Sequence, residues 1–166
     1  AVVSYKTPAE ARNQRIEMVY QDLSLCDTID VAGNLFLGRE LLAAPHAMGF
    51  LNKREMMKEA RRMLGDLEIS IPNLAATVAQ LSGGQRQSIA IARAAAFEPQ
   101  VLIMDEPTSA LAVAEVEAVL ALIQRVKSKG VSVVLITHRL QDLFRVCDRI
   151  AVMYEGTKVA ERNIAE

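Results

Sequence analysis

The chain has 166 residues and a formal net charge of −1; 51% of its residues are hydrophobic and 23% are charged. This length can bury a sizeable core, and the composition excludes an intrinsically disordered chain. The near-neutral charge and an aromatic content of 4% argue against nucleic acid as a partner. Cys26 and Cys147 form no CxxC pair, so neither a disulfide framework nor a zinc site is indicated. No run of about 18 apolar residues is present, so we expect no membrane-spanning helix.

The first part of the chain predicts one helix, one strand and then a long helical segment. Residues 7–10, Thr-Pro-Ala-Glu, are typical of a helix start, and a β-prone segment follows at 16–20. Asp30 is a suitable N-cap for a short helix to Leu37, and Asn52 for a longer helix to about residue 67.

The second part alternates between strand and helix patterns. Residues 101–104 and 131–137 are apolar runs, which predict strands buried on both faces. Helices are predicted at 113–129 and 140–146, and Glu155-Gly156 predicts a hairpin turn between two more strands. This order favours an α/β fold with a parallel, right-handed sheet and an edge hairpin.

Two adjacent carboxylates end the first of these apolar strands. Asp105 and Glu106 would lie at the carboxyl edge of the sheet, where α/β proteins bind ligands. One carboxylate can hold Mg²⁺ through its waters while the other accepts a proton from an attacking water. A solvated strand end is the alternative interpretation of this pair on its own.

A glycine pair precedes a predicted helix that runs to about Phe97. Ser82, Gly83 and Gly84 can bring backbone N–H groups and a hydroxyl close to a phosphate at the helix N-terminus. Taken alone, such a loop is more often a turn with an N-cap. The whole string Leu81–Gln87, placed shortly before Asp105, is more specific.

The chain resembles the ATPase domain of ATP-binding cassette (ABC) transporters. Residues 81–87 are similar to the signature loop of that family, and 102–107 to its Walker B strand. Gln21 matches the Q-loop glutamine and His138 the switch histidine. Residues 19–22 and 33–40 also resemble ATPases of bacterial importers for ribose, xylose and fructose.

The resemblance implies a partial P-loop NTPase-like parallel sheet core with a mainly helical insertion. Residues 1–166 would form a partial ABC ATPase domain. Within it, 24–97 would be the helical subdomain and 98–166 the C-terminal part of the α/β core.

The resemblance also implies roles for the site residues in MgATP hydrolysis. Asp105 and Gln21 would hold Mg²⁺, Glu106 would polarise the attacking water, and His138 would contact the γ-phosphate of ATP. The loop residues would bind the ATP of a facing subunit, and they are Ser82, Gly83, Gly84 and Gln85.

The implied partners follow from the same resemblance. They are a second ATPase domain, transmembrane permease subunits that contact residues 24–97, and indirectly a periplasmic sugar-binding protein. The expected location is the cytoplasmic face of the inner membrane. The alternatives are a non-transport ABC ATPase and an inactive fragment; residues 24–80 are too short and irregular for the long coiled coil of DNA-maintenance members.

Two departures from the family pattern stand out. The sequence contains no G-x-x-x-x-G-K-[ST] phosphate-binding loop, so we expect a truncated sequence that does not hydrolyse ATP by itself. Ala112 stands where the family usually has aspartate, in a loop that crosses the dimer interface. We assign no role to the second histidine, His46.

Overall fold

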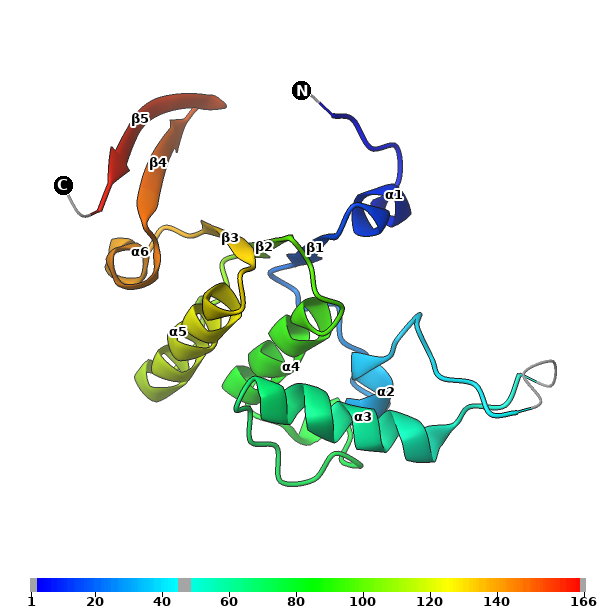
Figure 1. The fold of residues 1–166 in the computed structure, drawn as a ribbon. Coiled ribbons are helices and arrows are strands. Elements are labelled where there is room, and N and C mark those ends of the chain that lie inside the picture. The colour runs from blue at the N-terminus through cyan, green and yellow to red at the C-terminus, as the bar shows by residue number, and fades with distance from the viewer. Residues whose placement is uncertain (1–2, 45–48, 165–166) are drawn as a thin grey trace.

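Three parallel strands form the central sheet of the chain (Figure 1). In this computed structural model, which describes residues 3–44 and 49–164, they are β1 (Ile16–Val19), β2 (Val101–Asp105) and β3 (Ser132–Ile136). The spatial order is β1-β2-β3, and both pairs are parallel. The predicted α/β class with a parallel sheet is therefore confirmed. His46 lies outside the described residues.

Helices and one hairpin account for the other regular elements. The helices are α1 (Pro8–Asn13), α2 (Val31–Leu35), α3 (Lys53–Asp66), the short 3-10 helix η2 (Val78–Gln80), α4 (Gly83–Ala95), α5 (Val113–Ser128) and α6 (Leu140–Val146). The hairpin strands are β4 (Arg149–Tyr154) and β5 (Thr157–Asn163). None of the helices in the described ranges combines the length and the apolar character of a transmembrane span.

Polar side chains start the helices where the sequence predicts them. Thr7, Asp30 and Asn52 each accept a hydrogen bond from a backbone N–H three residues later, which satisfies one of the free donors of the first turn. Helix α2 ends at Leu35, two residues earlier than predicted, before the left-handed Gly38 (φ 76°).

One face of the sheet is buried, and the other is open along β3. Leu102 and Met104 are fully buried on the face where the core lies, and α4 and α5 contribute most of the helical core residues. On the opposite face Val134 and Ile136 remain 48% exposed. The prediction that both apolar strands are buried on both faces is therefore wrong. An apolar run shows that a strand is apolar on two sides, but not that other elements cover both.

The hairpin is a sheet of its own. Strands β4 and β5 pair with each other and, among the described residues, do not extend the parallel sheet. The prediction of a hairpin is confirmed, but its placement at the edge of the parallel sheet is wrong. Both turn residues, Glu155 (φ 45°) and Gly156 (φ 77°), are left-handed, as the tight turn of a twisted hairpin requires.

Candidate functional site

The motif residues meet at the carboxyl edge of the parallel sheet. Gln21 lies just after β1, Asp105 is the last residue of β2, and His138 follows β3. Because parallel strands end at one edge, residues from three distant parts of the chain reach the same region. Gln21 and His138 are exposed, whereas Asp105 and Glu106 are partly buried.

Glu106 and His138 are in direct contact. The Glu106 Oε1 atom lies 2.8 Å from Nδ1 of His138 and accepts the backbone N–H of the same residue at 3.1 Å. The Thr137 hydroxyl donates to Oε2 at 3.3 Å. The backbone N–H of Glu106 donates to the Ile136 carbonyl at 2.8 Å, and Glu106 adopts a left-handed φ of 48°. The end of β3 therefore holds both the backbone and the carboxylate of Glu106.

The surroundings of Glu106 favour its ionised form. Burial acts to raise the pKa of this carboxyl, but the hydrogen bond and charge of His138, its backbone N–H and the Thr137 hydroxyl outweigh burial and lower the pKa overall. The carboxylate is therefore available as a proton acceptor at neutral pH.

The buried carboxylate of Asp142 contacts the loops that carry Glu106 and His138. The Asp142 Oδ2 atom accepts a hydrogen bond from the Thr108 hydroxyl at 2.6 Å and forms an ion pair with Nε of Arg139 at 3.0 Å. Thr108 follows Glu106 by two residues and Arg139 follows His138 directly. Asp142 thus links the two loops that carry Glu106 and His138. Sequence reasoning missed Asp142, although its place in the first turn of a helix after His138 was a usable signal.

Ser82 starts helix α4 through reciprocal capping. Its hydroxyl accepts the Gln85 N–H at 3.3 Å, and the Gln85 side chain accepts the Ser82 N–H at 3.0 Å. Over the described residues, no hydrogen bond links this loop to Glu106 or His138. The structure therefore joins Glu106 to His138, but it leaves the loop of Ser82 as a separate part of the site.

A carboxylate that sequence reasoning missed sits at this loop. Glu115, in the first turn of α5, accepts the Ser82 hydroxyl at 2.8 Å, the Gly84 N–H at 2.9 Å and the Ala112 N–H at 3.2 Å. These hydrogen bonds, first that of Gly84 and then that of Ser82, lower the pKa of Glu115. The N-termini of α4 and α5, both positive ends of helix dipoles, share one carboxylate.

The absent side chain of Gly84 makes room for this contact. A Cβ at Gly84 would lie 2.8 Å from both Cβ and Cγ of Glu115. Ala112, the N-cap residue of α5, has no side-chain acceptor, and its own backbone N–H donates to Glu115.

The oxygen ligands at the carboxyl edge of the sheet suit a magnesium ion that binds together with a phosphate-bearing ligand. Within the described ranges, no group of three His, Cys, Asp or Glu residues could hold a metal by itself. Mg²⁺ commonly binds one or two carboxylates together with substrate phosphates and water. The carboxylate of Asp105 and the amide of Gln21 fit that arrangement.

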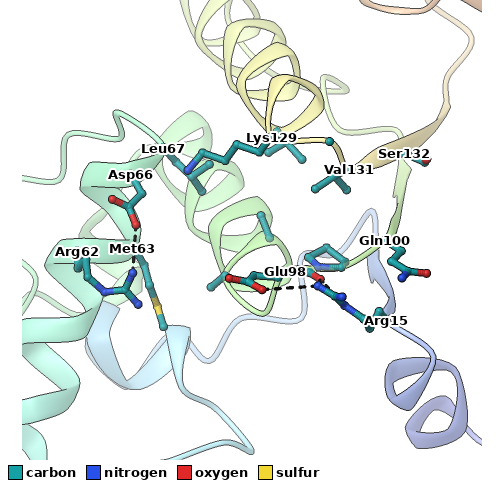
Figure 2. A pocket seen from close by; sticks show the side chains of 15 residues that line it. Arg15, Arg62, Met63, Asp66, Leu67, Glu98, Gln100, Lys129, Val131 and Ser132 are labelled. Carbon is teal, nitrogen blue, oxygen red and sulfur yellow. Dashed lines mark hydrogen bonds and ion pairs between the residues drawn. The ribbon is translucent and has the colours of Figure 1, made fainter.

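A cleft of about 530 Å³ lies at the opposite edge of the sheet. Its lining includes Arg15, Gln100 and Ser132, which stand at the beginnings of the three strands. Figure 2 shows two ion pairs among its charged side chains, Arg15 with Glu98 and Arg62 with Asp66. This cleft therefore lies at the amino ends of the strands, whereas α/β sheets bind their ligands at the carboxyl ends.

The fold and the ordered motifs define a nucleotide-binding domain of the ABC class, and a family comparison agrees. Residues 3–109 match the family model described as ABC transporter. The chain belongs to the ABC transporter family.

The relatives include import ATP-binding proteins for sugars. The chain is 41% identical to the xylose/arabinose import ATP-binding protein of Sulfolobus acidocaldarius, over 99% of the chain and 66% of that protein. It is 44% identical to the fructose import ATP-binding protein of Rhizobium meliloti, over 97% and 64%. A ribose import ATP-binding protein of Bacillus licheniformis is 39% identical over 98% of the chain and 32% of its own length. The chain thus spans about two thirds of the first two relatives.

Solved structures share the fold. A dimeric post-hydrolysis state of the ATP-binding cassette MJ0796, bound to ADP and Pi, superposes with a TM-score of 0.73 and 26% identity. The match covers 96% of this chain and 68% of that one. The ADP conformation of the cassette MJ1267 gives a TM-score of 0.74 at 24% identity, over 97% and 65%.

Proposed function

We propose that this chain is part of the ATP-hydrolysing subunit of an ABC importer for sugars. The observation that carries the proposal is the contact between Glu106 and His138 at the carboxyl edge of the sheet, next to Asp105. Phosphoryl transfer to water needs a positioned proton acceptor and charge stabilisation, and these side chains supply both kinds of group.

Each site residue has a role in this proposal. Glu106 accepts the proton of the attacking water, and His138 contacts the γ-phosphate of ATP as it leaves. Asp105 and Gln21 hold the Mg²⁺ that enters with ATP; the ion supplies charge neutralisation on the phosphates. The lowered pKa of Glu106 supports its role, since it keeps the carboxylate ionised.

The loop of Ser82, Gly83, Gly84 and Gln85 acts on a second nucleotide. Among the described residues, no hydrogen bond joins this loop to Glu106 or His138. This separation supports a role in which the loop binds the ATP of a facing ATPase domain. In this proposal two such domains close on two ATP molecules, and hydrolysis allows them to separate.

The importer assignment rests on the named relatives and on a group of exposed apolar side chains. The xylose/arabinose, fructose and ribose import ATP-binding proteins are similar over nearly all of the chain. Large apolar side chains are exposed around the helical segment that follows β1, namely Leu37, Leu42, Phe50 and Leu51. Such side chains are typical of a protein contact, here with a permease at the cytoplasmic face of the membrane. A periplasmic sugar-binding protein would act on the permease from the other side.

The test uses the product of the whole reading frame that contains this chain. We expect MgATP hydrolysis by the purified protein, and in vesicles with the permease, sugar uptake that depends on ATP. A purified, folded protein without MgATP turnover would contradict the ATPase assignment. Turnover that permease and sugar do not change would favour the non-transport alternative.

A further inference from the structure

An arginine of helix α4 forms hydrogen bonds with the turn that follows β1. Arg93 donates through Nη1 to the Ser24 carbonyl at 2.8 Å and through Nη2 to the Leu23 carbonyl at 2.9 Å. These residues lie about seventy positions apart in the sequence, so the contact exists only in the folded chain. None of the ion pairs found among the described residues includes Arg93, and both hydrogen bonds of its side chain go to main-chain carbonyls.

The two residues whose carbonyls accept these hydrogen bonds have an unfavourable backbone conformation. Leu23 (φ 61°) and Ser24 (φ 48°) are consecutive left-handed residues, and neither is a glycine. Left-handed backbone is sterically costly for a side chain as bulky as leucine and persists only where surrounding contacts enforce it. A planar guanidinium can hold two neighbouring carbonyls at once, which the single ammonium of lysine does less well.

The same turn carries Gln21. The Leu23 N–H donates to the Tyr20 carbonyl at 3.0 Å, so Gln21 and Asp22 are the central residues of a closed turn directly after β1. The exposed Gln21 side chain has no hydrogen-bond partner within the described residues, so its location depends on the backbone of this turn.

We propose that Arg93 is a positioning residue that holds the turn at residues 20–24 and thereby sets the place of Gln21 at the nucleotide edge. This inference rests on the proposed function. Helix α4 runs unbroken from Gly83 to Ala95, so the loop of Ser82 and the turn of Gln21 are attached to one rigid element. Engagement of Ser82 with a facing nucleotide would thus reach Gln21 of the same subunit through Arg93.

The first experiment measures hydrogen exchange at the Leu23 amide in this chain. Arg93→Lys should raise the exchange rate by about tenfold or more, because the turn opens without the paired hydrogen bonds. Adding Leu23→Gly and Ser24→Gly should restore protection, since glycine adopts left-handed backbone without strain. The matched control is Arg15→Lys. Arg15 also donates two hydrogen bonds to a main-chain carbonyl, which belongs to the left-handed residue Glu98. The control variant should leave the Leu23 amide unchanged.

Three results would overturn the hold of Arg93 on the turn. They are unchanged protection in Arg93→Lys, an equal loss in the Arg15→Lys control, and no recovery with the two glycines. If Arg93→Lys does not fold, the variant that also carries both glycines decides. Folding with a protected Leu23 amide supports the proposal, whereas continued unfolding shows that Arg93 serves the core rather than the turn.

The second experiment measures MgATP turnover by the product of the whole reading frame. Arg93→Lys should lower kcat about tenfold with KM for ATP nearly unchanged, and the glycines should restore kcat, because the defect is a misplaced group. Normal kcat in a variant whose Leu23 amide has lost protection would overturn the link to Gln21. Absence of turnover in the wild type would contradict the proposed function instead, and the exchange result would still decide whether Arg93 holds the turn.

Discussion

The Glu115 carboxylate accepts a hydrogen bond from the Ser82 hydroxyl, 33 residues earlier in the chain, at 2.8 Å. A hydroxyl has one proton to donate, so in this arrangement Ser82 cannot donate to a phosphate at the same time. The Gly84 N–H is also engaged by the same carboxylate oxygen. For the loop to bind the nucleotide of a facing domain as proposed, these two donors must leave Glu115.

Glu115→Gln should lower the thermal stability of the chain. The change removes the charge shared by two helix N-termini and turns an acceptor atom into a donor beside the Ala112 N–H, so we expect a Tm about 2 to 4 °C lower. Calorimetry at pH 7 measures it. The control is Glu117→Gln on the same helix, whose exposed pair with Arg145 is worth little, and its Tm should change by less than about 1 °C.

The effect of Glu115 should depend on pH in one direction. Its pKa in the folded chain is lowered, so its contribution to stability is complete above the unfolded pKa of about 4.3 and is lost as the pH falls through the folded pKa. The Tm difference between wild type and Glu115→Gln should therefore shrink below about pH 4. A difference that grows in acid would contradict this assignment.

Gly84→Ala should destabilise the chain by about 1 to 3 kcal/mol, because its Cβ would lie 2.8 Å from Glu115 and force atoms apart. Gly65→Ala is the control, since a Cβ there meets no atom within 4 Å and the residue lies within α3. It should stabilise by about 0.5 to 1 kcal/mol through helix propensity. Urea denaturation separates the two signs, and stabilisation by both changes would show that Glu115 does not need the space at Gly84.

The helix starts could be predicted from the sequence, whereas the contact of Glu115 could not. A threonine, asparagine or serine cap and the N–H that it accepts lie three residues apart, so Thr7, Asn52 and Ser82 carry local signals. Glu115 meets Ser82 only because α4 and α5 pack with their N-termini together. No short-range pattern encodes that packing.

The candidate site shows the same division. The carboxyl edge could be predicted, because apolar strands that end in Asp105 and His138 have a known polarity in a parallel sheet. The hydrogen bonds of Asp142 and Arg93 join segments more than thirty residues apart, so their partners depend on the fold. The burial of β3 was predicted wrongly, since Val134 is apolar yet exposed.

Glu106→Gln should lower MgATP turnover at least about a hundredfold in the product of the whole reading frame, because the amide cannot accept the proton of water. Nucleotide binding should persist, since size and most hydrogen bonding are kept. Phosphate release and equilibrium binding are the two measurements. Turnover near the wild-type rate would show that another group is the base.

His138→Ala should raise the pKa of Glu106. The imidazole hydrogen bond and its charge are the largest influences that lower this pKa, and only the backbone N–H at position 138 and the Thr137 hydroxyl would remain. A carboxyl ¹³C titration of the isolated chain measures the shift. The stability that Glu106 contributes above its unfolded pKa of about 4.3 should also decrease. An unchanged or lower pKa in the variant would show that His138 is not the controlling neighbour.

Ser82→Arg should block closure of two ATPase domains but spare nucleotide binding to one. A bulky cation would replace the small side chain where a close approach to phosphate is needed. Light scattering of this variant mixed with Glu106→Gln protein, both from the whole reading frame, should show no ATP-dependent dimer. If Ser82→Arg instead dimerises normally and loses its own nucleotide affinity, the loop acts within its own subunit.

The open face of the sheet has a consequence for the behaviour of the chain in solution. Val134 and Ile136 bring apolar atoms to water, and a net charge of −1 gives little repulsion between copies. Salts that are excluded from protein surfaces, such as sulfates, strengthen the burial of exposed apolar area. The solubility of the isolated chain should therefore fall steeply in ammonium sulfate, while moderate sodium chloride changes it little.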